Sequence, residues 1–205
     1  MNLLHAVGDR AILVDCDDLE AVLALNAALT VAPPDGIVDI VPAARTVLVT
    51  FDPARLSADR VTGWIRSTPP VPPEVWGYSD VVEIDVQYSG EDLAEVAALL
   101  STSEREVVQA HTASVWRVAF VGFAPGFGYL VTDSPQLVVP RRASPRTSVP
   151  AGSVGLAGEY TGVYPRSSPG GWQIIGRTDA VLWDPDATTP ALLVPGRVVR
   201  FREAS

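Results

Sequence analysis

The chain has 205 residues, a length that suits one large domain or two small ones. Hydrophobic residues make up 47% of it and charged residues 19%, a composition that forms a buried core and excludes general disorder. All 15 cationic side chains are arginines, which excludes both a phosphate-binding loop of the GxxxxGK[ST] type and a Schiff-base lysine.

The net charge of -9 is unevenly distributed along the chain. Residues 1–110 hold 6 Arg and 18 acidic residues (6 − 18 = -12), whereas residues 111–205 hold 9 Arg and 6 acidic residues (9 − 6 = +3). This division indicates two domains and argues against nucleic-acid binding by the whole chain. The second half is therefore the part that we expect to attract a small anion.

Nothing in the sequence predicts a membrane partner or an export signal. No apolar run approaches the ~20 residues that span a bilayer, and no basic segment followed by an apolar one opens the chain. The single cysteine, Cys16, has no partner for an internal disulfide. We therefore expect a cytoplasmic protein.

The first part of the chain predicts a small α+β sandwich over residues 1–78, with helices on one face of an antiparallel sheet. A hairpin is expected around the Gly8-Asp9 turn, and Asp17 or Asp18 is placed to cap the helix that follows. The predicted strands are 3–7, 11–14, 37–42 and 46–51, and the predicted helices are 19–32 and 58–67, the second capped by Ser57. Residues 68–78 are rich in Pro and Gly, which predicts a linker.

The second part, residues 79–205, predicts a closed β-barrel, because many short strands alternate with Gly and Pro turns. Two short helices are expected first, and a capping box begins at Ser103 for the second of them. The predicted strands are 81–88, 115–122, 136–139, 153–157, 173–176, 192–194 and 198–201, and the predicted helices are 93–100 and 103–112.

Residues 121–178 carry most of the distinctive motifs, with glycine and proline interleaved among aromatic residues and arginines. Arg142 and Arg146 are separated by an even number of positions, so an extended backbone places them on one face. Two guanidinium groups on one face suit a carboxylate or phosphate. A solvated edge strand protected by charge and proline is the equally weighted alternative.

The other constellations are less specific. Gly170 and Gly171 form either an anion-binding nest or a plain hairpin turn. His111, at the end of a predicted helix, is either a catalytic base or a satisfied structural histidine. Two His and one Cys without paired spacing predict no metal site.

The order of these motifs resembles the allophanate hydrolase subunit 1 family, which includes the B subunit of prokaryotic 5-oxoprolinase and KipI-like kinase inhibitors and is built from carboxyltransferase subdomains C and D. The resemblance extends over nearly the whole chain. It is carried by Gly8-Asp9, 11–14, 36–42, Phe51-Asp52-Pro53, Asp92-Leu93, His111, Gly122-Phe123, Pro125-Gly126-Phe127, Tyr129-Leu130, Pro140-Arg141, Pro145-Arg146, 149–154, 161–165, 169–172 and 175–178. Tyr160 departs from the family, which usually has Gln before Thr-Gly, and this departure bears on ligand or partner specificity.

The resemblance implies a cyclophilin-like β-barrel for the second domain and a subunit of an ATP-dependent 5-oxoprolinase, inactive alone. Implied partners are a barrel protein of the subunit 2 type (similar to KipA or to the C subunit of 5-oxoprolinase), a third TIM-barrel-like subunit and a small anionic lactam. ATP with Mg²⁺ is the implied co-substrate, with no tightly bound cofactor. A KipI-like regulator that inhibits a sensor histidine kinase is the alternative function.

These inferences together give the candidate site residues. His111, Arg142 and Arg146 are the catalytic candidates. Substrate or nucleotide contacts are expected from Pro125, Gly126, Phe127, Tyr164, Gly170, Gly171, Trp172 and Arg177.

Overall fold

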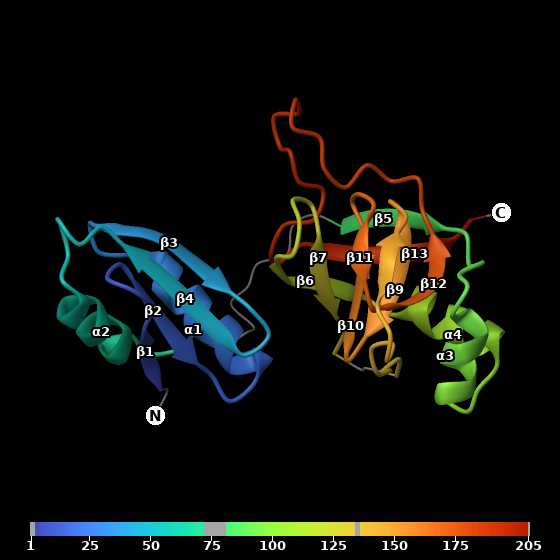
Figure 1. Ribbon diagram of the computed structural model, residues 1–205, viewed down its shortest axis with the longest axis horizontal. Helices are drawn as coiled ribbons and strands as arrows, with labels where there is room; N and C mark the ends of the chain where they lie inside the picture. Colours follow the sequence, from blue (N-terminus) through green and yellow to red (C-terminus); the bar gives the residue numbers. More distant parts are fainter. Residues whose placement is uncertain (1–2, 72–80, 134–135, 205) are drawn as a thin grey trace. The chain divides into compact units, whose positions relative to one another are not determined.

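The computed structural model describes residues 3–71, 81–133 and 136–204, and the chain divides into two compact units, Met1–Gly77 and Tyr78–Ser205. Most of the predicted linker falls on residues 72–80, outside the described residues. Figure 1 shows the helices and strands of each unit. Each unit has a hydrophobic core of its own.

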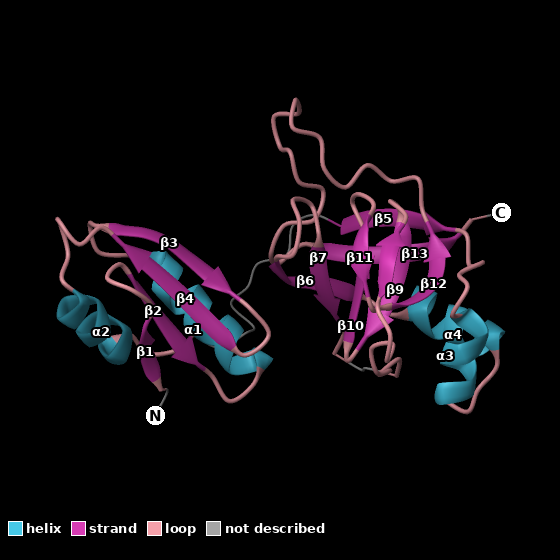
Figure 2. Ribbon diagram, viewed as in Figure 1, coloured by secondary structure: helices cyan, strands magenta, loops and turns pink. Residues whose placement is uncertain are grey.

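The first unit is the predicted sandwich of one antiparallel sheet and two helices (Figure 2). Its strands have the order β1-β2-β4-β3, and one core joins the sheet to both helices. Alternation along β4 sends Val47, Val49 and Phe51 into that core, as the period of a half-buried strand requires. The elements are β1 (Leu4–Ala6), β2 (Ala11–Asp15), α1 (Leu19–Val31), β3 (Ile37–Pro42), β4 (Thr46–Phe51) and α2 (Ala58–Ser67).

The helix starts follow the predicted capping chemistry with one exception. Asp18 Oδ1 accepts a hydrogen bond of 2.8 Å from the Ala21 amide at the start of α1. Ser103 and Glu106 form the predicted capping box of α4 (Glu104–Ala113). Ser57 precedes α2 in an extended conformation, but its side chain makes no capping hydrogen bond.

The second unit is a nearly closed barrel, so the predicted α+β class with a second barrel domain is confirmed. Its seven-stranded sheet has the order β12-β9-β10-β7-β6-β13-β5. Main-chain hydrogen bonds of 2.8 and 2.9 Å between Gln87 and Arg177 connect the two ends of this order. The further elements are β5 (Val81–Val86), α3 (Leu93–Leu99), β6 (Trp116–Val121), β7 (Gly128–Val131), β8 (Arg146–Val149), β9 (Ser153–Ala157), β10 (Tyr160–Val163), β11 (Ser168–Gly170), β12 (Gln173–Arg177) and β13 (Val198–Glu203).

Two predicted strands of the barrel are absent from the described residues. In the segment 136–139, only Val139 pairs, through a single bridge to Gly158. Residues 192–194 belong to an irregular arm in which Trp183 bridges Ala191. Each segment is bounded by proline, which lacks the amide donor that a strand ladder needs. Four short strands, β7, β8, β10 and β11, were not predicted, because glycine or proline lies within β7, β10 and β11 and prolines flank the four residues of β8.

Candidate functional site

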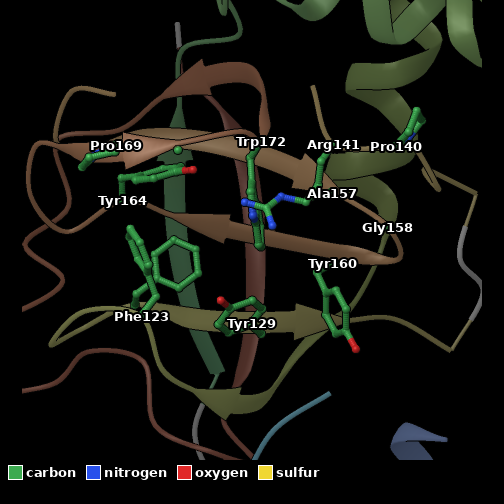
Figure 3. A pocket seen from close by; sticks show the side chains of 12 residues that line it. Phe123, Tyr129, Pro140, Arg141, Ala157, Gly158, Tyr160, Tyr164, Pro169 and Trp172 are labelled. Atoms are coloured by element: carbon green, nitrogen blue, oxygen red, sulfur yellow. The ribbon is translucent and has the colours of Figure 1, made fainter. Parts of the chain in front are cut away.

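A cavity of about 420 Å³ opens on the second unit, and six aromatic side chains make most of its wall. We call it the aromatic cup (Figure 3). Its lining consists of Phe123, Phe127, Tyr129, Pro140, Arg141, Ala157, Gly158, Tyr160, Tyr164, Pro169, Gly170 and Trp172. A concave, mostly apolar cavity with few polar groups is the usual form of a small-molecule site.

The barrel strands hold the rings of the aromatic cup in edge-to-face contacts. Phe127 meets Trp172 with ring centroids 5.3 Å apart at 85°, and Tyr129 meets Trp172 at 5.5 Å and 67°. Gly162 leaves space behind them, since a Cβ there would lie 3.1 Å from both Phe127 Cζ and Trp172 Cζ3. The aromatic quadrupoles favour this arrangement, so the wall is rigid before any ligand arrives.

Arg141 is the one cation among the described residues that line the aromatic cup. Its guanidinium extends from the segment before β8 toward Trp172 (Figure 3), and its Nη2 would lie 3.7 Å from a Cβ on Gly171. No carboxylate in the described part of the chain forms a hydrogen bond or ion pair with Arg141. Burial raises the pKa of Tyr129, and the positive charge of Arg141 opposes that rise. The cup therefore offers one unneutralised guanidinium beside apolar rings.

Arg142 and Arg146 do meet, but on a carboxylate of this chain rather than on a ligand site. Arg142 Nη1 lies 2.5 Å and Arg146 Nη2 2.7 Å from Asp92 Oδ1. Arg146 Nε also lies 2.8 Å from Glu91 Oε1. Asp92 is buried, and the Ile174 amide donates to its Oδ2 at 2.6 Å. The hydrogen bond to Asp92 raises the pKa of Arg146.

This cluster gives Arg142 and Arg146 a structural role, and the catalytic role predicted for them remains a prediction. Their charges are balanced by Asp92 and Glu91, so they are not free to bind an incoming anion. They connect the start of α3 to the segment that carries Arg141 and to β12 instead. The even spacing predicted their convergence, but the sequence did not show that Asp92, about fifty positions earlier, is their partner.

His111 has the burial and the contacts of a satisfied structural histidine, and its predicted role as a catalytic base remains a prediction. Its side chain is fully buried and does not line the aromatic cup. Tyr88 Oη lies 2.7 Å from its Nδ1, and Thr161 Oγ1 lies 2.9 Å from its Nε2. Because the Thr161 hydroxyl donates to the Gly155 carbonyl, Nε2 is assigned as the donor and Nδ1 as the acceptor of the Tyr88 proton.

Burial lowers the pKa of His111 from 6.5 to about 3. Between pH 6.5 and about 3, His111 is therefore protonated in the unfolded chain and neutral in the folded chain. Its contribution to the free energy of unfolding is complete above pH 6.5 and is lost as the pH falls toward 3. We expect the free energy of unfolding of wild type to fall by up to about 1.4 kcal/mol per pH unit more than that of His111→Gln in this window. Urea unfolding at pH 7, 6, 5 and 4 measures the difference, and parallel curves would contradict it.

The remaining predicted contacts divide between the cup and other surfaces. Phe127, Tyr164, Gly170 and Trp172 line the aromatic cup, whereas Pro125 and Gly126 line a neighbouring groove. Gly171 lies beside the cup, and its carbonyl accepts a hydrogen bond of 2.8 Å from the Arg142 amide. Arg177 is exposed at the barrel seam and pairs with Asp179 at 3.0 Å.

Sequence reasoning missed four side chains of the cup that bear on recognition: Phe123, Tyr129, Tyr160 and Arg141. The first two had a signal, because the odd-numbered positions 123, 127 and 129 carry aromatic residues just before and within β7. The only signal at Tyr160 is its departure from a family pattern. No periodic pattern distinguishes Arg141 in the sequence, because the adjacent Arg142 lies in the same proline-rich segment.

Metal-binding clusters and membrane-spanning helices would each indicate another kind of site. No group of three or more His, Cys, Asp or Glu suited to hold a metal ion occurs in the described parts of the chain. No helix within those parts is long and apolar enough to cross a membrane.

Comparison with known proteins assigns the family. The model of the carboxyltransferase domain, subdomain C and D, matches residues 2–193. The chain belongs to this family. It is 44% identical over 172 residues to a protein of Escherichia coli O157:H7 named as the B subunit of 5-oxoprolinase, covering 80% of this chain and 77% of that one. A protein of the same name from Bacillus subtilis is 50% identical over 124 residues, covering 59% of this chain and 52% of that one.

A solved structure supports the fold over almost the whole chain. TTHA0988 superposes with a TM-score of 0.78 at 40% sequence identity and covers 96% of this chain. The chain spans only 40% of TTHA0988, so that relative carries further protein in the same polypeptide.

Proposed function

We propose that this chain is a subunit of an ATP-dependent 5-oxoprolinase and that its aromatic cup binds the lactam substrate. The relatives named as the B subunit of 5-oxoprolinase support the enzyme class. The observation that carries the site is Arg141, a guanidinium without an ion-pair partner among the described residues that stands among aromatic rings.

The chemistry of 5-oxoproline matches this surface. The substrate is a five-membered lactam ring that bears one carboxylate. The guanidinium of Arg141 is suited to a bidentate pair with that carboxylate, while the ring carbons pack against Trp172 and Tyr164. The substrate ring would cover part of the exposed Arg141 side chain on binding, and the loss of water there would strengthen the ion pair.

The cup fits the lactam better than it fits ATP. A triphosphate with Mg²⁺ requires several cations or amide donors, whereas Arg141 is the one cation on the described lining and Arg142 and Arg146 are already paired. We therefore assign lactam binding to this subunit and expect most of the phosphate contacts to come from another one. ATP would transfer its terminal phosphoryl group to the lactam oxygen and leave as ADP, which makes the ring carbon electrophilic enough for water to add. Cleavage of the C–N bond would then open the ring to γ-glutamyl phosphate, and a second water would hydrolyse this acyl phosphate to glutamate and phosphate.

The proposed partners follow from the same assignment. The word subunit in the names of the relatives implies an assembly of different chains. We propose a C-type barrel subunit as the direct partner and a third, TIM-barrel-like subunit for hydrolysis.

Reconstitution tests this function directly. The purified chain, the C-type subunit and the third subunit are mixed with 5-oxoproline, ATP and Mg²⁺, and glutamate and ADP are quantified. We expect equal amounts of both products from the full mixture and none from this chain alone. A correctly assembled complex that forms no glutamate would contradict the proposal.

A further inference from the structure

A second cavity, also of about 420 Å³, lies next to the aromatic cup on the same unit. One wall is the loop of residues 121–126, and the other belongs to the arm of residues 179–196, which projects from the barrel between β12 and β13 (Figure 1). We call this cavity the arm groove. Phe123 lines both the arm groove and the aromatic cup, so the two cavities are neighbours that share this side chain.

The arm groove exposes more apolar surface than a barrel edge requires. Phe123 is 58% exposed and Trp183 is 41% exposed, and Val181, two positions before Trp183 on the arm, is 69% exposed. Among the described residues, none that lines this cavity is charged. Contiguous exposed apolar surface of this kind marks an interaction site, and aromatic residues dominate the energy of protein interfaces.

The walls of the arm groove are preformed. Gly126 has a φ of +83°, and a Cβ there would lie 2.8 Å from Trp183 Cβ and 2.9 Å from the Leu182 carbonyl oxygen. The loop therefore packs directly on the arm, whose two sides are joined by a hydrogen bond of 3.0 Å from the Leu192 amide to the Leu182 carbonyl. Phe123 itself has a φ of +66°, a conformation that bulky residues avoid and that concentrates at functional positions.

We propose that the arm groove is the docking surface for the C-type subunit, an inference that rests on the proposed function. The occupant is an apolar loop flanked by Lys or Arg. Its charge follows from the arm, because residues 179–196 contain three aspartates and no cation. Asp184 and Asp186 are exposed beside Trp183, and a basic flank on the partner complements them.

The position of the arm groove also bears on the cations for ATP phosphates that the aromatic cup lacks. A partner seated against Phe123 stands at the mouth of the cup, where its basic flank can supply the cations for the phosphates of ATP. TTHA0988, of which this chain covers only 40%, is a relative with additional protein available to cover such a surface.

Binding between this chain and the purified C-type subunit tests the docking surface. We expect Trp183→Glu, which puts a charge in the groove, to raise the Kd about 100-fold, and Phe123→Ala to raise it about 10-fold. The matched control is Val115→Glu, since Val115 is 45% exposed on the same unit but lines neither the cup nor the groove. It should bind like wild type. Isothermal titration calorimetry measures each Kd, and circular dichroism confirms that each variant is folded.

The outcomes separate this inference from the proposed function. If Trp183→Glu and Phe123→Ala bind the C-type subunit as tightly as wild type, the docking surface is wrong even where the full mixture produces glutamate. If Val115→Glu weakens binding as much as they do, the groove has no special role and the inference also fails. If the groove variants lose binding but the wild-type complex produces no glutamate, the docking surface stands and the proposed function falls.

Discussion

Asp92→Ala is expected to destabilise the second unit by about 3–5 kcal/mol, because it leaves two partly buried guanidinium groups without their shared carboxylate. The Asp92 side chain is 3% exposed, and it accepts from Arg142, Arg146 and the Ile174 amide. Its removal leaves the Ile174 amide without its acceptor and leaves the two guanidinium groups with only the exposed carboxylates of Glu91 and Glu95. Urea unfolding followed by tryptophan fluorescence measures the loss.

Glu95→Ala is the matched control for this prediction. Glu95 Oε2 also faces Arg142 Nη1, at 3.6 Å, but its side chain is 56% exposed. An exposed pair contributes only about 0–1 kcal/mol and weakens further in high salt, whereas the buried Asp92 contribution should persist in roughly 0.5 M NaCl. If both variants unfold alike, the Asp92 cluster is not the connection between α3, the Arg141 segment and β12 that its geometry indicates.

The first unit was more predictable from the sequence than the second for a physical reason. In the first unit, local signals agree: alternation gives β3 and β4 within their observed bounds, and Asp18 caps α1 as expected. In the barrel, strands of three or four residues are defined by pairing with distant segments. β10, for example, pairs with β9 and β7, and Gly162 within it makes space for Phe127 and Trp172 although glycine has a low strand propensity.

The site was predictable as a region but not as a set of contacts. The density of glycine, proline and aromatic residues pointed to the part of the barrel where the aromatic cup lies, and four of the residues predicted as contacts line the cup. Which arginine lacks an ion-pair partner among the described residues depends on contacts with residues that are distant in the sequence. Asp92 neutralises Arg142 and Arg146 from 50 and 54 positions away, and this leaves Arg141 as the available cation of the described cup lining. Local spacing carries no information about such a partner.

Arg141→Ala is expected to weaken 5-oxoproline binding by about 2 kcal/mol, or roughly 30-fold in Kd, because hydrogen bonds between charged groups contribute about that much. Arg141→Lys should lose less, since the charge remains while the planar fork is lost. Trp172 lies in the cup wall, so its fluorescence during titration with 5-oxoproline reports occupancy. Glutamate formation in the full mixture should decrease with the loss of binding.

Arg166→Ala distinguishes the role of Arg141 from a general effect of net charge. Arg166 is exposed on the same unit and does not line the cup, so its removal changes the net charge equally without touching the proposed carboxylate site. We expect this variant to bind 5-oxoproline like wild type. Equal affinities of wild type, Arg141→Ala and Arg166→Ala for 5-oxoproline would show that the lactam carboxylate does not bind to Arg141 in the cup. A selective loss in Arg141→Ala would show that the Asp92 cluster, by occupying Arg142 and Arg146, leaves one arginine to recognise the substrate.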